Sequence, residues 1–124
     1  MKQIKVLFKG YYWCKNTFPE TSGVYAIYST NDNKVSKLCY IGRSNNIDRR
    51  IKEHANSDYP AKDKYCYSYC ELSEYQAKLS EAALVNECQP IGNDQYKDEY
   101  PEDYESVELI IEGEHYQIPN TIRR

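Results

Sequence analysis

One stretch in the first half of the chain constrains the fold more than any other, because it passes directly from a strand into a helix. Residues 39–54 read CYIGRSNNIDRRIKEH. The apolar run that opens this stretch is strand-like, and Gly42 lets a backbone or a ligand approach where a side chain would block it. Asn45 and Asn46 are both candidate N-caps for a helix that begins at Ile47. The stretch therefore predicts a strand, a turn and a helix that bring several cationic side chains together.

The expected helix covers residues 47–56 and has a single apolar stripe. The stripe recurs every four residues, at Ile47, Ile51 and Ala55. Successive helical residues are about 100° apart, so Arg50 and His54 lie beside the stripe, whereas Arg49 and Glu53 point away from it. We therefore expect Arg50 and His54 to face inward or sideways.

The length of the chain suits a single domain over residues 1–124, because domains usually contain about 50–250 residues. No apolar run approaches the roughly 20 residues that cross a bilayer, and the start of the chain lacks the apolar centre of a signal peptide. We therefore expect a soluble protein of the cytoplasm, or of the host cytoplasm if the gene belongs to a phage or another mobile element.

The cysteines form no C-x-x-C pair, which favours reduced and packed thiols. They are Cys14, Cys39, Cys66, Cys70 and Cys88. A zinc site formed by Cys66 and Cys70 with Cys88 or His54 is the minor alternative, since the usual paired spacing is absent.

The formal net charge of −3 is unevenly distributed along the chain. Residues 1–93 contain 13 Lys and Arg against 10 Asp and Glu, whereas residues 94–124 contain 3 against 9. Binding to nucleic acid normally uses a basic surface. The first part of the chain is therefore compatible with a nucleic-acid partner, although the charge of the whole chain argues against one.

The remaining pattern predicts short strands and a second helix. We expect strands at residues 4–8, 24–28, 38–42, 64–72, 107–111 and 116–118, and a helix from a capping box at residues 73–76 to about residue 88. The first is interpreted as an edge strand, the next two as a hairpin and the last two as a terminal hairpin. A polar segment with Pro60 follows the first helix. This order predicts an α+β fold with a small, mainly antiparallel, three-stranded central sheet flanked by helices, plus extra N- and C-terminal strands.

The second helix places a carboxylate among apolar side chains. Its apolar face consists of Ala77, Leu84, Val85 and Cys88. The 3.6-residue repeat projects Glu81 from the middle of that face, and burying an unpaired charge costs several kcal/mol. Glu81 should therefore meet a metal ion, the floor of a cleft, or a cation such as an inward-leaning Arg or Lys. These explanations are compatible with one another.

Several of these residues occur in an order and spacing known from one family. They are Gly23-Val24-Tyr25, Tyr40-Ile41-Gly42, Arg50, His54, Glu81, Pro90 and Asn93. Over residues 22–93 the chain resembles the GIY-YIG nuclease domain, in which an Arg follows the second motif's Tyr by ten positions, as Arg50 follows Tyr40. In the bacterial excision-repair branch a metal-binding Glu precedes an Asn by twelve positions, as Glu81 precedes Asn93. The chain departs from the pattern in reading GVY for GIY and in carrying Arg43 where Lys is frequent.

The resemblance implies a metal-dependent endonuclease that hydrolyses DNA, with RNA left open as a substrate. Glu81 would hold one Mg²⁺ or Mn²⁺. Water molecules and the substrate phosphate would complete the coordination shell of this ion. Tyr25 would activate the attacking water, because a phenol near a cation loses its proton more readily. Tyr40 would be the alternative base or would position the phosphate. The remaining expected roles are a phosphate clamp for Arg50, a proton relay for His54, and places beside the substrate for Arg43, Asn93 and Gly42.

Each of these residues also has an ordinary structural explanation. Strand tyrosines usually pack, an Arg and a His one helical turn apart usually form a solvated flank, and Asn beside Gly often follows a helix end. The alternative function is a catalytically silent module that binds nucleic acid or protein, and it would lack Glu81 or Arg50. Because both are present, we expect Tyr25, Tyr40, Arg50 and Glu81 to border one pocket wide enough for a phosphate.

Residues 94–105 form an acidic connection, DQYKDEYPEDYE, outside the region of resemblance. The simpler interpretation is that it leads into a strand pair that extends the sheet or packs against residues 4–8. The other is that it mimics the charge of nucleic acid and shields the basic cleft, or binds a protein partner or a second copy of the chain.

Overall fold

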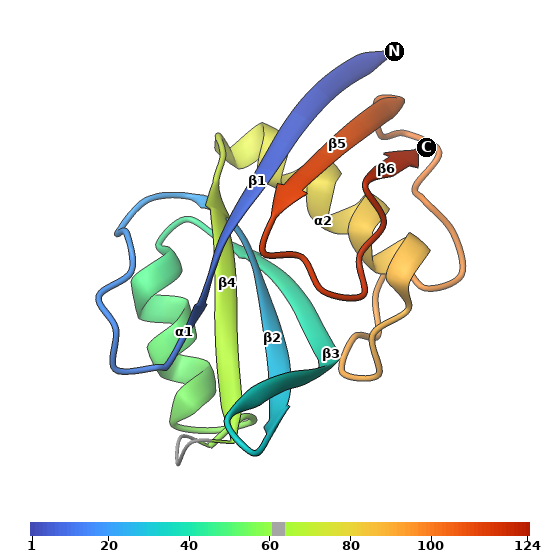
Figure 1. The fold of residues 1–124 in the computed structure, drawn as a ribbon. Coiled ribbons are helices and arrows are strands. Elements are labelled where there is room, and N and C mark those ends of the chain that lie inside the picture. The colour runs from blue at the N-terminus through green and yellow to red at the C-terminus, as the bar shows by residue number, and fades with distance from the viewer. Residues whose placement is uncertain (61–63) are drawn as a thin grey trace.

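The computed structural model describes residues 1–60 and 64–124, and within these residues the chain forms six strands and two helices (Figure 1). They are β1 (Lys2–Tyr12), β2 (Gly23–Asn31), β3 (Lys34–Ser44), α1 (Ile47–Ala55), β4 (Tyr65–Glu71), α2 (Glu74–Cys88), β5 (Val107–Gly113) and β6 (Thr121–Arg123). The expected α+β class is confirmed. The polar segment expected after the first helix includes residues 61–63, which lie outside the described residues.

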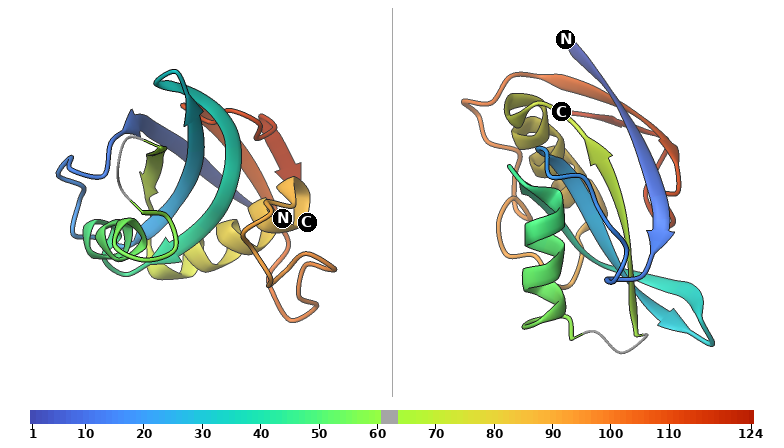
Figure 2. Two further views of the ribbon diagram at one scale, coloured as in Figure 1. Left: turned by 90° about the horizontal axis from the view of Figure 1, so that it is seen from below. Right: turned by 90° about the vertical axis from the view of Figure 1, so that its left-hand side faces the viewer.

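The strands form one curled sheet in the order β3-β2-β4-β1-β5-β6 (Figure 2). The expected three-stranded central sheet is not confirmed, because the antiparallel strands β3, β2 and β4 are one end of this larger sheet. All pairings are antiparallel except that of β1 with β5, which runs in parallel from Lys2 opposite Val107 to Phe8 opposite Gly113. All six described strands therefore belong to a single layer.

The interpretation of residues 4–8 as an edge strand is wrong, because β1 lies between β4 and β5. Its weak alternation suggested an edge strand. The structure shows that Ile4, Val6 and Phe8 are buried in the cluster that contains the apolar side chains of α2, while Lys5 and Leu7 are exposed on the other face of the sheet. The alternation therefore marks an outer face and not an edge.

The expected hairpin of β2 and β3 is confirmed, and its turn has only two central residues. Asp32 and Asn33 adopt φ angles of 51° and 62°, and Asn31 pairs with Lys34. Asp and Asn tolerate this left-handed conformation better than other residues with side chains. Among the described strands β3 pairs only with β2, so it is an edge strand of the sheet.

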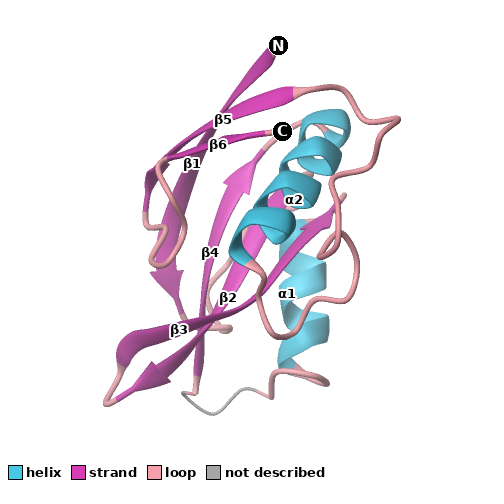
Figure 3. Cartoon of the chain, turned by 90° about the vertical axis from the view of Figure 1, so that its right-hand side faces the viewer, coloured by secondary structure: helices cyan, strands magenta, loops and turns pink. Residues whose placement is uncertain are grey.

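The two helices cover opposite faces of the strand β2, which lies between them (Figure 3). Val24, Ala26 and Tyr28 pack in the cluster that contains the apolar side chains of α2. Tyr25 and Ile27 pack in a second cluster with Ile47 and Ile51 of α1. Alternate residues of one strand thus contribute to two cores.

Both helices begin at the expected caps. Asn46 Oδ1 accepts a hydrogen bond from the Arg49 N–H at 3.0 Å, which decides between the two candidate caps of α1. Ser73 Oγ accepts one from the Gln76 N–H at 3.2 Å at the start of α2. Such caps typically contribute about 1 kcal/mol. Neither helix in the described ranges is long and apolar enough to cross a membrane.

The expected strand at residues 107–111 is confirmed as β5, but the strand expected at residues 116–118 is wrong. A turn occupies that segment, with Gln117 at a φ of 63° and a hydrogen bond of 3.0 Å from the Ile118 N–H to the His115 carbonyl. The Tyr28 hydroxyl also donates to the Tyr116 carbonyl at 2.9 Å. These bonds replace those of a strand, and the chain pairs with β5 again only at β6.

All five cysteines are free thiols in the structure. Cys66 and Cys70 are buried on β4, and Cys14, Cys39 and Cys88 are half-buried.

Candidate active site

The two motif tyrosines lie beside each other because Gly42 has no side chain. Tyr25 on β2 pairs directly with Gly42 on β3, so its phenol lies over the glycine. A Cβ at residue 42 would overlap the Tyr25 Oη and Cζ atoms and would also approach the Tyr40 ring. The ring centroids of Tyr25 and Tyr40 are 6.2 Å apart. The glycine thus sets the geometry of the phenol pair.

His54 on α1 contacts the first phenol. Its Nε2 atom is 2.8 Å from the Tyr25 Oη, and both side chains are about 1% exposed. Burial, and then the positive charge of Arg50, lower the pKa of His54 to about 4, so the imidazole is neutral at pH 7. Its Nδ1 atom has no hydrogen-bond partner among the described residues, and Asp58 Oδ2 lies 4.0 Å from it. A neutral imidazole with Nδ1 protonated can accept a proton at Nε2.

Both phenols are protonated at rest. Burial raises the pKa of Tyr25 far above its ordinary value, and the Arg50 guanidinium opposes this shift. Burial and then the negative charge of Glu81 raise the pKa of Tyr40, and Arg50 again opposes. The resting site therefore contains no phenolate. A base role for either tyrosine requires a neighbouring group that takes the phenol's own proton.

Arg50 lies at the outer side of this cluster. Its side chain is 38% exposed, and Nη1 contacts Glu53 Oε1 at 3.2 Å. The expected orientations on α1 are confirmed, because His54 is buried and Arg50 half-buried, whereas Arg49 and Glu53 are exposed. Arg50 thus keeps a partly solvated positive charge next to two phenols.

Glu81 on α2 forms an ion pair with Arg43, whose Nε atom is 3.1 Å from Glu81 Oε1. Only 13% of the Glu81 side chain is exposed. Burial raises the pKa of Glu81, and the adjacent Arg43 counteracts the shift. The cation expected for this carboxylate is therefore an arginine from the end of β3.

A cavity of about 210 Å³ opens beside Glu81. It is lined by Tyr40, Glu81 and residues 92–96, which are Gly92, Asn93, Asp94, Gln95 and Tyr96. Tyr40 and Glu81 border one pocket, but the expectation that Tyr25 and Arg50 border it as well is wrong, because neither lines this cavity. Tyr25 and His54 lie next to Tyr40, with ring centroids 6.2 and 5.0 Å from that of Tyr40, and Arg50 is close enough to affect its pKa.

Asn93 attaches the cavity loop to the edge of the sheet. Its Oδ1 accepts from the Ile41 N–H at 3.0 Å, and its Nδ2 donates to the Ile41 carbonyl at 2.8 Å. The Gly92 N–H donates to the Cys39 carbonyl at 2.9 Å. Through these bonds the loop continues the hydrogen-bonding pattern of β3, and the amide of Asn93 is used for this attachment.

Tyr59 is part of the aromatic cluster, although the sequence did not mark it. Its ring centroid is 5.9 Å from that of Tyr40 and 5.7 Å from that of His54. It follows the helix in a segment interpreted only as polar, and no periodic pattern extends to it. Asp94 was similarly assigned to the acidic connection, although it lines the cavity.

The residues at the cavity fit one hard divalent cation that keeps most of its water. Glu81 supplies a shielded carboxylate, and Asp94 lines the same space. No group of three or more His, Cys, Asp or Glu side chains that could hold a metal is present among residues 1–60 and 64–124. Mg²⁺ is commonly held by one or two carboxylates plus waters and substrate phosphate, so the small donor set suits it.

Comparison with known proteins places these residues within a described domain. The family model of the GIY-YIG catalytic domain matches residues 21–95. UvrABC system protein C of Dictyoglomus thermophilum is 32% identical over 92 residues, which cover 68% of this chain and 15% of that protein. The protein of the same name from Borrelia duttonii is 29% identical over 118 residues, covering 80% and 19%. That from Bdellovibrio bacteriovorus is 33% identical over 95 residues, covering 68% and 14%.

The chain thus spans less than a fifth of the length of these curated relatives. No solved structure matches it.

Proposed function

The chain belongs to the GIY-YIG nuclease family, and we propose that it is an endonuclease that hydrolyses phosphodiester bonds of DNA with one divalent cation at Glu81. The observation that carries the proposal is the position of Glu81 and Tyr40 on one cavity, with the Tyr25–His54 pair next to Tyr40, whose ring centroid is 5.0 Å from that of His54. Hydrolysis requires a deprotonated water, charge stabilisation at phosphorus and a neutralised leaving oxygen. Each requirement has a candidate within this cluster.

The attacking water would lose its proton to the Tyr25–His54 pair. As the water oxygen bonds to phosphorus, its proton passes to Tyr25 Oη, and the phenol's own proton passes to His54 Nε2. The P–O bond to the leaving oxygen then breaks, and solvent supplies that oxygen with a proton. Because His54 is neutral at pH 7 and 2.8 Å from the phenol, the transfer does not require a free phenolate.

Tyr40 is the alternative base, and one observation favours it. Its side chain is half-buried and lines the cavity, whereas Tyr25 is about 1% exposed. If Tyr40 is not the base, it positions the phosphate together with Arg50, whose planar fork suits a phosphate group.

The cation would be Mg²⁺ or Mn²⁺ and would stabilise negative charge on the phosphate oxygens. Glu81 would bind it, and Arg43 would then be released from its ion pair or share the carboxylate. Gly42 and Asn93 support this arrangement through the phenol pair and the cavity loop.

The acidic segment of residues 94–105 is proposed to limit access of polyanions to the cavity. Asp94, Gln95 and Tyr96 line the cavity itself, and Asp98 and Glu99 line the adjoining surface. A like-charged segment at this place repels a phosphate backbone until the backbone displaces it. Binding of a protein partner or a second copy through the same segment is the alternative use.

Incubation with supercoiled, linear, branched and single-stranded DNA, and with RNA, tests the proposal directly. We expect cleavage with Mg²⁺ or Mn²⁺, none with EDTA, and at least a 100-fold loss of rate in Glu81→Ala and Arg50→Ala. Equal cleavage by the wild type and both variants would identify a contaminant or another site. Binding without cleavage of any substrate would support the silent binding module.

A further inference from the structure

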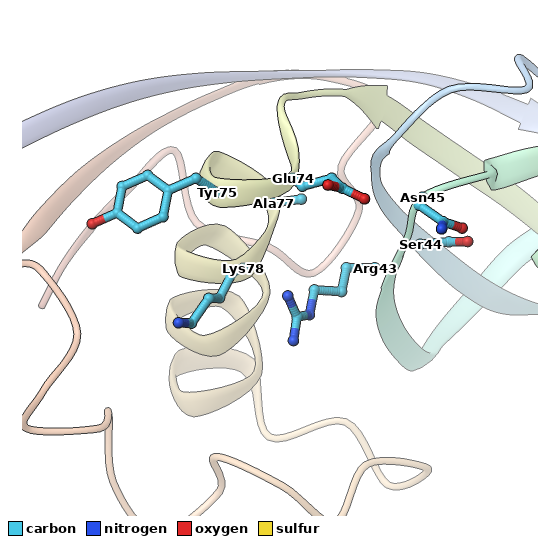
Figure 4. Close-up of a pocket in the computed structure, with 7 residues that line it drawn as sticks. All are labelled: Arg43, Ser44, Asn45, Glu74, Tyr75, Ala77 and Lys78. Carbon is cyan, nitrogen blue, oxygen red and sulfur yellow. The ribbon is translucent and has the colours of Figure 1, made fainter.

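A second groove, of about 480 Å³, lies between the end of β3 and the first turns of α2 (Figure 4). It is lined by Arg43, Ser44, Asn45, Glu74, Tyr75, Ala77 and Lys78. We propose that this groove binds the phosphodiester backbone of the DNA strand beside the scissile bond, through Arg43 and Lys78. The inference rests on the proposed nuclease function, because it assigns the path of the same substrate away from the cavity.

Arg43 connects the groove with the cavity. Its Nε atom contacts Glu81, which lines the cavity, while the arginine itself lines the groove. The ion pair engages Nε, so the Nη1 and Nη2 groups form a separate set of donors, and 41% of the side chain is exposed. Figure 4 shows the guanidinium group projecting beside the Lys78 side chain. A strand in contact with these donors passes directly next to Glu81.

Lys78 supplies a positive charge that no carboxylate neutralises. Among the described residues no Asp or Glu oxygen lies within 4.0 Å of its Nζ atom, which instead lies 4.6 Å from the Tyr104 ring centroid. A cation over a tyrosine ring keeps its full charge and can bind a phosphate at the same time. In a chain of net charge −3, an unpaired lysine beside an arginine is a site where a polyanion gains contacts.

The remaining groove residues fit a phosphodiester strand more closely than a free anion. Asn45 Oδ1 accepts from Arg49 Nη2 at 2.8 Å, which places a second guanidinium, after that of Arg43, at this end of the groove. Tyr75 has an aromatic side chain that is 49% exposed, with Lys2 Nζ 5.8 Å from its ring centroid and its hydroxyl donating to Glu105 at 2.8 Å, and such a ring can stack against a base. Glu74 is the single carboxylate among the lining residues, and since Arg43 is already paired with Glu81, Lys78 is the lining cation that has no carboxylate partner among the described residues. Extended, mixed polar and aromatic lining of this kind suits a strand that runs along it.

Salt-dependent binding tests the groove. Fluorescence anisotropy of a labelled 20-nucleotide single strand and duplex is measured in EDTA over a series of salt concentrations, so that binding is followed without cleavage. We expect Lys78→Gln to bind about 3- to 10-fold more weakly at low salt. It should also reduce the slope of log K against log salt by about 0.7–0.9, the amount expected for one lost phosphate contact. Lys78→Arg should keep the wild-type slope.

Lys5→Gln is the matched control, because Lys5 is 71% exposed on the opposite face of the sheet from α2. It should bind like the wild type. Identical slopes for Lys78→Gln and Lys5→Gln in a protein that binds and cleaves DNA would overturn the proposed role of the groove and leave the proposed nuclease function intact. A wild type that neither binds nor cleaves DNA would overturn both. In cleavage assays with Mg²⁺, Lys78→Gln should raise KM by a similar factor and leave kcat within about twofold.

Discussion

The Tyr25 hydroxyl lies 2.8 Å from His54 Nε2, and this contact joins a central strand to a helix 29 positions later in the chain. Both groups are buried, the phenol is protonated and the imidazole is neutral. In the proposed mechanism the pair takes a proton from outside at Tyr25 and ends with a positive charge on His54, so no buried phenolate has to form first. The contact is the basis for proposing a chemical role for Tyr25 that its burial alone would not suggest.

Tyr25→Phe should reduce kcat at least 100-fold, because it removes the hydroxyl through which the proton passes and leaves the ring in place. Tyr28→Phe is the matched control on the same strand, since its hydroxyl donates to the Tyr116 carbonyl at 2.9 Å. That variant should lose about 1 kcal/mol of unfolding free energy and keep its kcat. Single-turnover cleavage and urea unfolding measure the two effects. Equal losses of kcat in both variants would argue against a proton-transfer role for Tyr25.

Stability should fall below neutral pH because of His54. In the unfolded chain its pKa is near 6.5, whereas burial and then Arg50 lower the folded value to about 4. Between these two values the unfolded state binds a proton that the folded state does not, so the free energy of unfolding decreases as pH falls from 6.5 to 4. The contribution is up to about 3 kcal/mol. Subtracting the urea-unfolding profile of His54→Gln from that of the wild type isolates this component, and parallel profiles would contradict it.

Glu81→Gln should abolish binding of a divalent cation at the cavity, because a neutral amide is a much poorer ligand than a carboxylate. Titration with Mn²⁺, followed by its electron paramagnetic resonance signal, measures binding without any need for activity. Glu87→Gln is the control from the same helix, because its carboxylate pairs with Arg124 at 3.1 Å and does not line the cavity. It should bind one Mn²⁺ like the wild type. Retained stoichiometric binding in Glu81→Gln would place the ion elsewhere.

Asn93→Ala should destabilise the protein by about 2–3 kcal/mol, because it leaves both backbone groups of buried Ile41 without a partner. Hydrogen exchange at the Ile41 amide should accelerate in parallel. Asn45→Ala is the control, since Asn45 is exposed and its side chain bonds only to Arg49 among the described residues. That change should cost less than about 0.5 kcal/mol. Unchanged exchange at Ile41 in Asn93→Ala would show that the loop is attached by other contacts.

The position of the acidic segment, rather than its charge alone, should govern DNA affinity. Neutralising Asp98 and Glu99 together, as Asn and Gln, should tighten binding at least threefold, because both lie beside the cavity. Neutralising Glu112 and Glu114 as Gln changes the net charge by the same amount at the far end of β5, and it should have less than half that effect. Equal tightening of DNA binding in the two double variants would show that the acidic segment acts only through the net charge of the protein and not through its position.

The features that the sequence predicted are those encoded over a few residues. The caps at Asn46 and Ser73, the tight β2–β3 turn, and the exposure pattern of α1 all depend on neighbours within four positions. Glu81 was recognisable because a carboxylate in an apolar helix face requires an explanation. Its ion-pair partner was foreseen only as a class, because Arg43 lies on a different element.

The features that the sequence did not predict depend on distant pairings. The central place of β1 requires β5, which follows about a hundred residues later, and no local pattern distinguishes an outer sheet face from a sheet edge. The turn at residues 115–118 depends on Tyr28 and on the left-handed Gln117. Tyr59 joins the site only because helix α1 ends beside Tyr40. These positions are fixed by packing, which overrides local preference.

The parallel pairing of β1 with β5 also affects how the chain folds during synthesis and where it can be truncated. During synthesis on the ribosome, β1 emerges before β5 and must wait for residues 107–113 before its second edge is occupied. Until then the apolar side chains of Ile4, Val6 and Phe8 lack their full cover. A fragment of residues 1–93 would keep the family motifs and still expose this strand, so ending the chain at residue 93 should yield an aggregating polypeptide rather than a smaller enzyme.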